Sequence, residues 1–158
     1  MPALNVKRNL PEYISGFVDG EGSFCVSFSR RKKLLVGWET KPSFSVGQKE
    51  ERANVLGLMQ KFFGCGFMRK DSSDGTVKYE VRSLNDLISK IIPHFEKYQL
   101  KGRKQNDFIA FKKAVEIMKT NKHLEKEGLK AIIFLASSMT KNPRRIKNLQ
   151  NIITLLKV

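Results

Sequence analysis

Two stretches of this chain alternate apolar and polar residues with the period of a β-strand, and this alternation is what most constrains its fold. Residues 23–30 read Ser-Phe-Cys-Val-Ser-Phe-Ser-Arg, and residues 43–48 read Ser-Phe-Ser-Val-Gly-Gln. Such alternation predicts strands with one face against a core and the other face in a polar environment. The basic run Arg30–Lys33 is expected at the tip of a hairpin, with the chain returning from Leu34 onward. The side chains expected to face the core are Phe24, Val26, Phe28, Phe44 and Val46.

Helical patterns lie on both sides of this hairpin. Residues 11–19 are expected to form a helix, with Pro11 in its first turn and with Gly20 and Gly22 ending it. A second helix is expected over residues 50–63 and is ended by the glycine that follows. Its apolar positions, which recur with the helical period, are Val55, Leu58, Met59, Phe62 and Phe63.

A second hairpin is expected to follow, and more helices after it. Residues 65–70 and 76–82 carry the strand pattern, and the loop 71–75 between them is rich in turn residues. Consecutive antiparallel hairpins separated by helices indicate an α+β fold with a layered sheet. The later helices are expected over residues 84–97, 103–120, 125–139 and 142–157.

The chain is expected to form a single domain. It has 158 residues, which is enough for one core and too few for two ordinary domains. No Pro/Ser-rich linker or low-complexity segment interrupts it. The domain therefore spans residues 1–158, with a core over about 11–140 and a basic, amphipathic helix over 141–158.

The charge of the chain favours a polyanionic partner. Thirty lysines and arginines stand against fifteen acids, which gives a formal net charge of +15. A field of this sign attracts polyanions and speeds their capture. A merely soluble basic protein, or one bound to anionic lipid, is the alternative. Nucleic acid is favoured because the charges are spread over the whole chain, whereas a membrane binder concentrates them in one segment.

The polar face of the predicted sheet is a candidate DNA-binding surface. A twisted antiparallel ribbon fits the major groove, where the base edges present a full donor and acceptor code. A solvated sheet face would also be polar, so the pattern alone leaves both readings open. The side chains on this face are Ser27, Ser29, Arg31, Lys41, Ser45, Arg69, Lys78, Glu80 and Arg82.

Two acids close to each other mark a candidate metal site. Asp19 and Glu21 lie at the carboxyl end of the first predicted helix, where the helix dipole disfavours anions. A hard divalent cation would explain them, because it binds carboxylates and the free carbonyls of a helix end. The alternative is that either acid bonds nearby amides or pairs with a lysine.

The stretch Ile14-Ser-Gly-Phe-Val-Asp-Gly-Glu-Gly22 closely resembles the LAGLIDADG motif of homing endonucleases, in its G-F-x-D-G-E-G-S-F form. Further pieces resemble the same family in the same order, and the resemblance runs from about Pro11 to Thr140. It implies an αββαββα core, a saddle-shaped antiparallel DNA-binding sheet and additional C-terminal helices. The further pieces are Phe44–Lys49, Gly64-Cys-Gly66, Lys104-Gln-Asn-Asp-Phe108 and His123–Leu129.

The resemblance implies roles at the motif itself. Glu21 matches the essential metal-binding acid and Gly20 a residue whose carbonyl also faces metal, while Asp19 supports the helix end. Only one motif copy is present, which implies a homodimer in which two Glu21 side chains converge; half of a two-copy monomer is the alternative. The residues expected at the dimer interface are Tyr13, Ser15, Gly16, Phe17 and Asp19.

The implied activity is a double-strand break in a long, roughly palindromic DNA target. Mg²⁺ is the expected cofactor; Mn²⁺ is expected to replace it, and Ca²⁺ to bind without cleavage. The residues expected to be catalytic are Glu21, Gln48, Arg52, Lys101 and Lys104. The side chains expected on DNA are Cys25, Ser27, Ser29, Arg30, Arg31, Lys32, Lys33, Lys41, Ser43, Ser45, Phe67, Arg69, Lys78, Glu80 and Arg82.

Other functions remain open at this point. A maturase that assists RNA splicing, or a DNA-binding protein that does not cleave, could use the same fold. A basic ribosome-associated protein is a third reading, and it would not need Glu21. Each of these predicts binding without cleavage.

The cysteines and the N-terminus bear on the compartment. Cys25 and Cys65 form no CxxC pair, and we interpret them as small core or sheet residues. The residues Met1–Asn5 lack the succession of a secretory signal, and no apolar run is long enough to cross a bilayer. We therefore expect an intracellular protein of a mitochondrion, a chloroplast, or a bacterial or archaeal cytoplasm.

Overall fold

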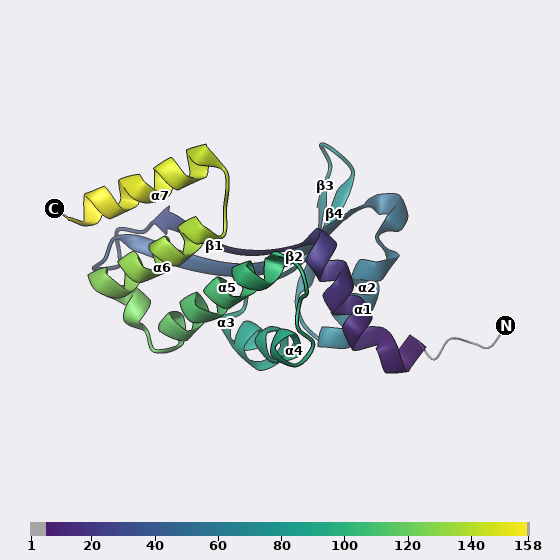
Figure 1. The fold of residues 1–158 in the computed structure, drawn as a ribbon. Coiled ribbons are helices and arrows are strands. Elements are labelled where there is room, and N and C mark those ends of the chain that lie inside the picture. The colour runs from purple at the N-terminus through teal and green to yellow at the C-terminus, as the bar shows by residue number, and fades with distance from the viewer. Residues whose placement is uncertain (1–5, 158) are drawn as a thin grey trace. The chain divides into compact units, whose positions relative to one another are not determined.

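A computed structural model describes residues 6–157 of the chain. Met1–Asn5, where no secretory signal was found, lie outside the described residues. The fold is α+β, and its elements follow the predicted order of helix, hairpin, helix, hairpin and helices (Figure 1). In chain order they are α1 (Val6–Glu21), β1 (Gly22–Arg30), β2 (Trp38–Lys49), η1 (Glu50–Arg52), α2 (Asn54–Phe63), β3 (Phe67–Asp71), β4 (Thr76–Val81), α3 (Leu84–Asp86), η2 (Leu87–Ile91), α4 (Ile92–Lys97), α5 (Lys104–Lys119), η3 (Lys122–Leu124), α6 (Lys126–Ser138) and α7 (Pro143–Leu156).

The four strands form one antiparallel sheet in the order β1-β2-β4-β3. The contacts of the chain divide into two compact units. The first contains the residues up to Ser23 together with Phe44–Gln105, and the second contains Phe24–Ser43 and the residues from Asn106 onward. Both β1 and β2 contribute residues to each unit. The expectation of a single domain therefore stays a prediction.

The core of the first unit is aromatic. Phe44 on β2 is opposite Val81 on β4, and Val46 is opposite Tyr79. The ring of Phe44 contacts those of Phe63 and Phe95, with centroids 6.2 and 5.6 Å apart. The period-two pattern therefore assigned the buried face of β2 correctly.

The helix α2 presents a different apolar face from the predicted one. Leu56 is fully buried, whereas Leu58 and Phe62 are each 38% exposed. The buried positions are Leu56, Met59 and Phe63, a stripe that turns one side of α2 toward the sheet. Phe62 lies at its margin, where its ring contacts that of His94 with centroids 5.4 Å apart.

The first helix is longer than predicted at both ends. It begins at Val6, so that Pro11 lies inside it and not in its first turn, and it includes Gly20. A proline inside a helix removes the backbone donor that would bond the carbonyl four residues earlier. The helix ends at Glu21, and the next position needs a glycine, because a Cβ at Gly22 would lie 2.5 Å from Cγ1 of Val18.

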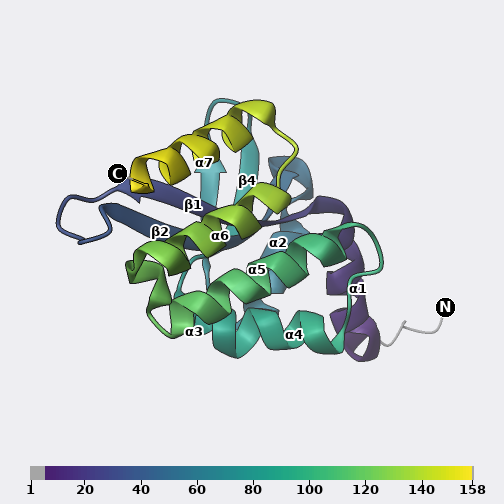
Figure 2. The ribbon, with the colours of Figure 1, turned by 60° about the vertical axis from the view of Figure 1, so that its left-hand side comes forward.

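In the second unit, helices cover the apolar side of β1. Phe24 packs on Phe108 and Phe111 of α5, with ring centroids 5.5 and 5.3 Å away. Helices α6 and α7 lie side by side (Figure 2). Arg145 of α7 donates hydrogen bonds to Sγ of Cys25 and to the carbonyl of Val26. Cys25 is thus a partly buried sheet residue with a polar neighbour.

The β1–β2 connection differs from the prediction. The return strand begins at Trp38 and not at Leu34. The amide of Leu34 bonds the carbonyl of Arg31, and the amide of Gly37 bonds the carbonyl of Leu34. Because of these turns, the chain does not join the strand pairing directly after Arg31. Gly37, whose φ of 76° suits glycine, is the last residue before β2 begins.

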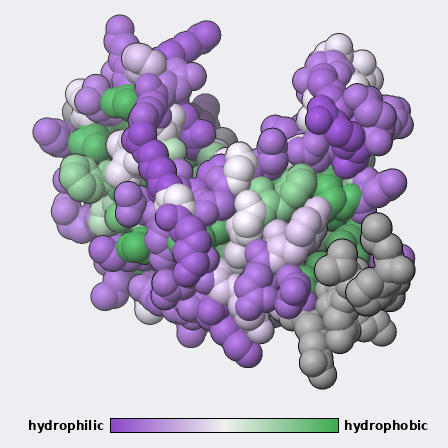
Figure 3. All heavy atoms as spheres, turned by 45° about the vertical axis from the view of Figure 1, so that its right-hand side comes forward, coloured by the Kyte–Doolittle hydropathy of each residue, from purple (hydrophilic) through white to green (hydrophobic). Residues whose placement is uncertain are grey.

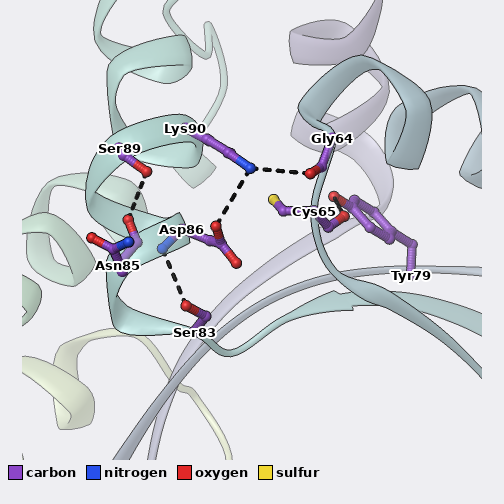
Figure 4. A network of polar contacts seen from close by, with 8 residues as sticks. All are labelled: Gly64, Cys65, Tyr79, Ser83, Asn85, Asp86, Ser89 and Lys90. Carbon is purple, nitrogen blue, oxygen red and sulfur yellow. Dashed lines mark hydrogen bonds and ion pairs between the residues drawn. The ribbon is translucent and has the colours of Figure 1, made fainter.

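The predicted helix over residues 84–97 is present as three consecutive pieces, α3, η2 and α4. Figure 4 shows how its beginning is held. The hydroxyl of Ser83 caps the amide of Asp86, and Lys90 bonds the carboxylate of Asp86 and the carbonyl of Gly64. The neighbouring carbonyl of Cys65 accepts a hydrogen bond from the hydroxyl of Tyr79. Burial raises the pKa of the Cys65 thiol, which agrees with a structural role.

We expect Gly66→Ala to lower the free energy of unfolding by about 3 kcal/mol. Gly66 has a φ of 82°, and a Cβ there would lie 2.7 Å from the carbonyl oxygen of Glu80. Gly64→Ala is the matched control: its φ is 63°, but nothing lies within 4 Å of its Cβ. It should cost about 1 kcal/mol. Urea unfolding measures both, and equal losses would contradict the steric argument.

Candidate active site

The end of α1 opens onto a polar pocket of the first unit, with a volume of about 400 Å³. Three residues predicted to be catalytic, Glu21, Gln48 and Arg52, line this one pocket. Its charged lining combines one carboxylate with three cationic side chains. The full lining is Glu21, Ser23, Ser45, Gly47, Gln48, Lys49, Arg52, Thr76 and Lys78.

The pairing of β2 with β4 positions several of the residues that line this pocket. In the β2–β4 register, Gly47 is opposite Lys78 and Lys49 is opposite Thr76. Successive side chains of a strand point to opposite faces, so Ser45, Gly47 and Lys49 share a face. Three of the lining residues, Ser23, Lys49 and Thr76, were not among the predicted site residues. Extending the alternation of Ser45 by two steps along β2 would have found Lys49.

The helix end that carries Glu21 is tied down by Asp19. Its Oδ2 accepts hydrogen bonds from the backbone amides of Lys101 and Gly102, at 2.8 and 2.7 Å. A Cβ at Gly102 would lie 2.8 Å from Oδ1 of Asp19, so glycine permits this approach. Two amide donors offset the repulsion between a carboxylate and the negative end of the helix. Asp19 therefore anchors the end of α1 to the backbone of Lys101 and Gly102.

The two candidate lysines have different positions. Lys101 lies in a separate pocket of about 330 Å³ beside Asp19. Nζ of Lys104 donates a hydrogen bond to the carbonyl of Gly22, the residue after Glu21. Neither lysine lines the pocket of Glu21. Of the two, Lys104 is the one whose ammonium group is held at the α1–β1 junction.

The outer face of α1 is partly exposed. Tyr13, Gly16 and Gly20 are exposed, Phe17 is partly buried, and the rings of Tyr13 and Phe17 lie 6.2 Å apart. Ser15, by contrast, is largely buried within its own chain. The expectation that Ser15 lies at a dimer interface stays a prediction.

Ser15 instead joins α1 to α4. Its hydroxyl donates to the carbonyl of Tyr98 at 2.6 Å and lies 3.2 Å from Nε2 of His94. Because the only hydroxyl hydrogen goes to Tyr98, Nε2 of His94 carries a hydrogen and donates to Ser15. His94 is buried among aromatic rings, and this burial lowers its pKa to about 4. The ring is therefore neutral near pH 7.

Ion pairs organise the predicted DNA-facing side chains. In the second unit, Glu39 holds Arg31 at 2.6 Å and Lys41 at 3.3 Å. The guanidinium of Arg30 lies 4.8 Å from the centre of the Trp38 ring. In the first unit, Glu80 departs from its expected exposure: it is only 6% exposed.

One face of the molecule is mainly hydrophilic. On the face that Figure 3 shows, hydrophilic side chains cover most of the surface, and hydrophobic ones gather in limited areas. Lys32, Lys33 and Arg69 are exposed. No helix within residues 6–157 is long and apolar enough to cross a membrane. In the pocket of Glu21, a carboxylate that could bind a cation lies near Lys and Arg side chains that could bind a phosphate.

Comparison with known proteins identifies the class to which this fold and pocket belong. The profile of the family described as "LAGLIDADG endonuclease" matches residues 14–115. "Probable intron-encoded endonuclease 2" of Neurospora crassa is 39% identical over 124 residues, which cover 78% of this chain and 27% of that protein. The chain therefore belongs to the LAGLIDADG endonuclease family, and the resemblance drawn from the motif is confirmed. It spans about a quarter of the length of the Neurospora relative.

Solved structures confirm the fold. The crystal structure of the homing endonuclease I-TnaI matches with a TM-score of 0.83 at 38% identity, covering 90% of this chain and 97% of that one. The structure of I-SmaMI bound to uncleaved DNA target in the presence of calcium ions matches with a TM-score of 0.82 at 33% identity. That match covers 89% of this chain and 48% of I-SmaMI.

The low pKa of His94 predicts a loss of stability in acid. The unfolded chain binds the proton near the ordinary pKa of 6.5, before the folded chain does near 4. Stability is therefore full above about pH 6.5 and falls as the pH drops toward 4. Between about pH 8 and about pH 5, the wild type should lose about 2 kcal/mol more than His94→Gln. Urea unfolding at both pH values checks this, and parallel pH profiles would contradict it.

Proposed function

We propose that this chain is a site-specific, double-strand DNA endonuclease of the homing type. The observation that carries the proposal is the pocket in which Glu21 meets Gln48 and Arg52 at the polar face of the sheet. The names of the relatives, and the DNA in the I-SmaMI structure, support the same substrate. The net charge of +15 suits a polyanion.

The proposed cofactor is Mg²⁺, with Mn²⁺ as a substitute and Ca²⁺ as a non-cleaving replacement. The Glu21 carboxylate and the Gly20 carbonyl, two hard oxygen donors at a helix end, would hold it. Within residues 6–157, no three Asp, Glu, His or Cys side chains gather as a complete metal site. The remaining ligands would come from phosphate, water and a second subunit. When bound, the cation neutralises phosphate charge and lowers the pKa of an attacking water.

The other pocket residues act on the phosphate and the water. Arg52, Lys49 and Lys78 bring positive charge to the pocket, which binds a phosphate and offsets the charge that develops in the transition state. The Gln48 amide can both donate and accept, so it can orient a water molecule. Lys104, anchored on the Gly22 carbonyl, is the candidate for contact with the reacting groups. Lys101 serves through its backbone amide, which binds Asp19.

We propose a homodimer formed through the outer face of α1. A Cβ at Gly16 or at Gly20 would have nothing within 4 Å in the single chain. Small residues spaced by four positions let two helix backbones approach closely. A twofold axis there would bring two Glu21 side chains together and would require a roughly palindromic target. The match of the chain to 48% of I-SmaMI agrees with a half-sized unit.

The proposed origin of the chain is an intron of an organellar genome. The name of the Neurospora relative describes an intron-encoded protein. A homing endonuclease in this setting would act on DNA in the compartment where it is made.

We expect Glu21→Gln to lower the cleavage rate at least about a hundredfold while it spares DNA binding. The amide loses the charge that holds Mg²⁺, and the exposed side chain contributes little to folding. Glu127→Gln is the matched control, because Glu127 is exposed and pairs with Lys130. Plasmids carrying a target selected from a random library are incubated with Mg²⁺ or with Ca²⁺.

The outcomes separate the candidate functions. Cleavage with Mg²⁺ and binding alone with Ca²⁺ support the endonuclease. Binding under both conditions with cleavage under neither would favour a maturase or a non-cleaving DNA-binding protein. Full cleavage by Glu21→Gln would contradict the proposed metal site.

We expect Gly16→Leu to convert the dimer to a monomer. The new side chain would separate the two α1 backbones, whereas the single chain has space for a Cβ at this position. Gly57→Leu on α2 is the control, since a Cβ there also meets nothing within 4 Å. Sedimentation measures the mass of each variant. Dimers in both variants would argue against an interface through α1.

A further inference from the structure

A buried carboxylate lies on the polar face of the β3–β4 hairpin. Glu80 on β4 is opposite Ser45 on β2 and Phe67 on β3. It is 6% exposed, although its strand neighbour on the same face, Lys78, lines the open pocket of Glu21. Burying a carboxylate is unfavourable unless charged or hydrogen-bonding partners replace the water that it loses. Glu80 therefore needs the partners that surround it.

Two arginines share one oxygen of Glu80. Nη2 of Arg82 donates to Oε2 at 3.0 Å, and Nε of Arg69 lies 3.7 Å from the same oxygen. The guanidinium of Arg82 also lies over the Phe67 ring, 5.4 Å from its centre. Both arginine side chains stay about half exposed, at 50% and 54%. The carboxylate of Glu80 is thus enclosed, while the side chains of Arg69 and Arg82 remain exposed to a ligand.

Glu80 orients the two arginines as well as offsetting part of their charge. Arg69 faces Glu80 through Nε, so the edge formed by its two terminal amino groups is not the edge that meets the acid. Arg82 is held by both the hydrogen bond to Glu80 and the contact with the Phe67 ring. An ordinary surface pair that links η1 to the same hairpin, Glu50 with Lys70, lacks this character because both of its side chains are exposed. Surface pairs of that kind contribute little to stability.

The chemistry of an oriented guanidinium selects its ligand. Phosphate binding needs positive charge, which a flexible lysine also supplies. A guanidinium of fixed orientation matches the O6 and N7 acceptors of guanine, which it binds with two parallel hydrogen bonds in the major groove. Glu80 could in principle accept from the amino group of cytosine. Its burial and its two arginine partners leave it poorly placed for that contact.

We propose that Glu80 is a positioning residue that holds Arg69 and Arg82 as a paired reader of guanine. The target half-site would then carry guanines at the base pairs beneath the β3–β4 hairpin. The inference rests on the proposed binding of double-stranded DNA by this sheet face, and it is independent of cleavage. It assigns Glu80 an indirect role in place of the direct DNA contact predicted from the sequence.

The test is selection of bound sites from a random double-stranded library in Ca²⁺, where binding is read without cleavage. Arg69→Lys and Arg82→Lys keep the charge but lose the planar fork, so each should relax the guanine preference at its own position. Glu80→Gln should relax both positions, with a roughly tenfold loss of guanine enrichment and unchanged preferences elsewhere. Glu50→Gln makes the same change of charge at an acid that pairs with Lys70 of this hairpin, and it should leave every preference intact.

Several results would overturn the proposal. One is a Glu80→Gln profile that keeps the guanine preference; another is a wild-type profile with no guanine at the positions that the arginine variants affect. A third is a uniform loss of affinity across all sequences, which would make the arginines phosphate clamps. Thermal unfolding reports whether Glu80→Gln folds, and Glu80→Asp, which withdraws the carboxylate by one methylene, replaces it if needed. A wild type that binds no DNA would contradict the proposed function as well.

Discussion

The anchoring of the end of α1 is the constraint on which the rest of the site depends. Glu21 is an exposed side chain, so its position is set by the backbone that carries it. Asp19 binds the amides of Lys101 and Gly102, and Lys104 donates to the carbonyl of Gly22. These bonds join residues about eighty positions apart in the sequence. They fix the helix end at the place where β2 presents Gln48 and η1 presents Arg52.

Two acids of the sheet organise its cations. Glu39 holds Arg31 and Lys41, and Glu80 holds Arg69 and Arg82. Each hairpin also places an arginine over an aromatic ring, Trp38 in one and Phe67 in the other. A sheet whose cations were all free would attract DNA but would not hold them in defined orientations. Glu39 and Glu80 therefore give the cations of this surface defined positions.

The sequence predicted features that depend on local periodicity and missed those that depend on distant packing. Alternation identified Phe44 and Val46 as core residues, because a strand must bury one face. It could not show that Ser15 turns inward, since its partners His94 and Tyr98 are about eighty residues away. The alternation of its strand predicts that Glu80 is exposed. Glu80 is buried in the structure because Arg69 and Arg82 pack against its carboxylate. The catalytic candidates Glu21, Gln48 and Arg52 came from the family resemblance, and the structure places them around one pocket.

The donor set at Glu21 explains why one chain would be insufficient for the proposed chemistry. A hard divalent cation takes about six or more oxygen ligands, and α1 offers one carboxylate with nearby carbonyls. Asp19 is engaged through its Oδ2, which accepts two backbone amides, and the acid that lines the pocket is Glu21. In the proposed complex, the further negative charge would come from DNA phosphate and from a second Glu21. An outer face of α1 with Gly16 and Gly20 exposed is what such a pairing needs, since side chains there would keep the two acids apart.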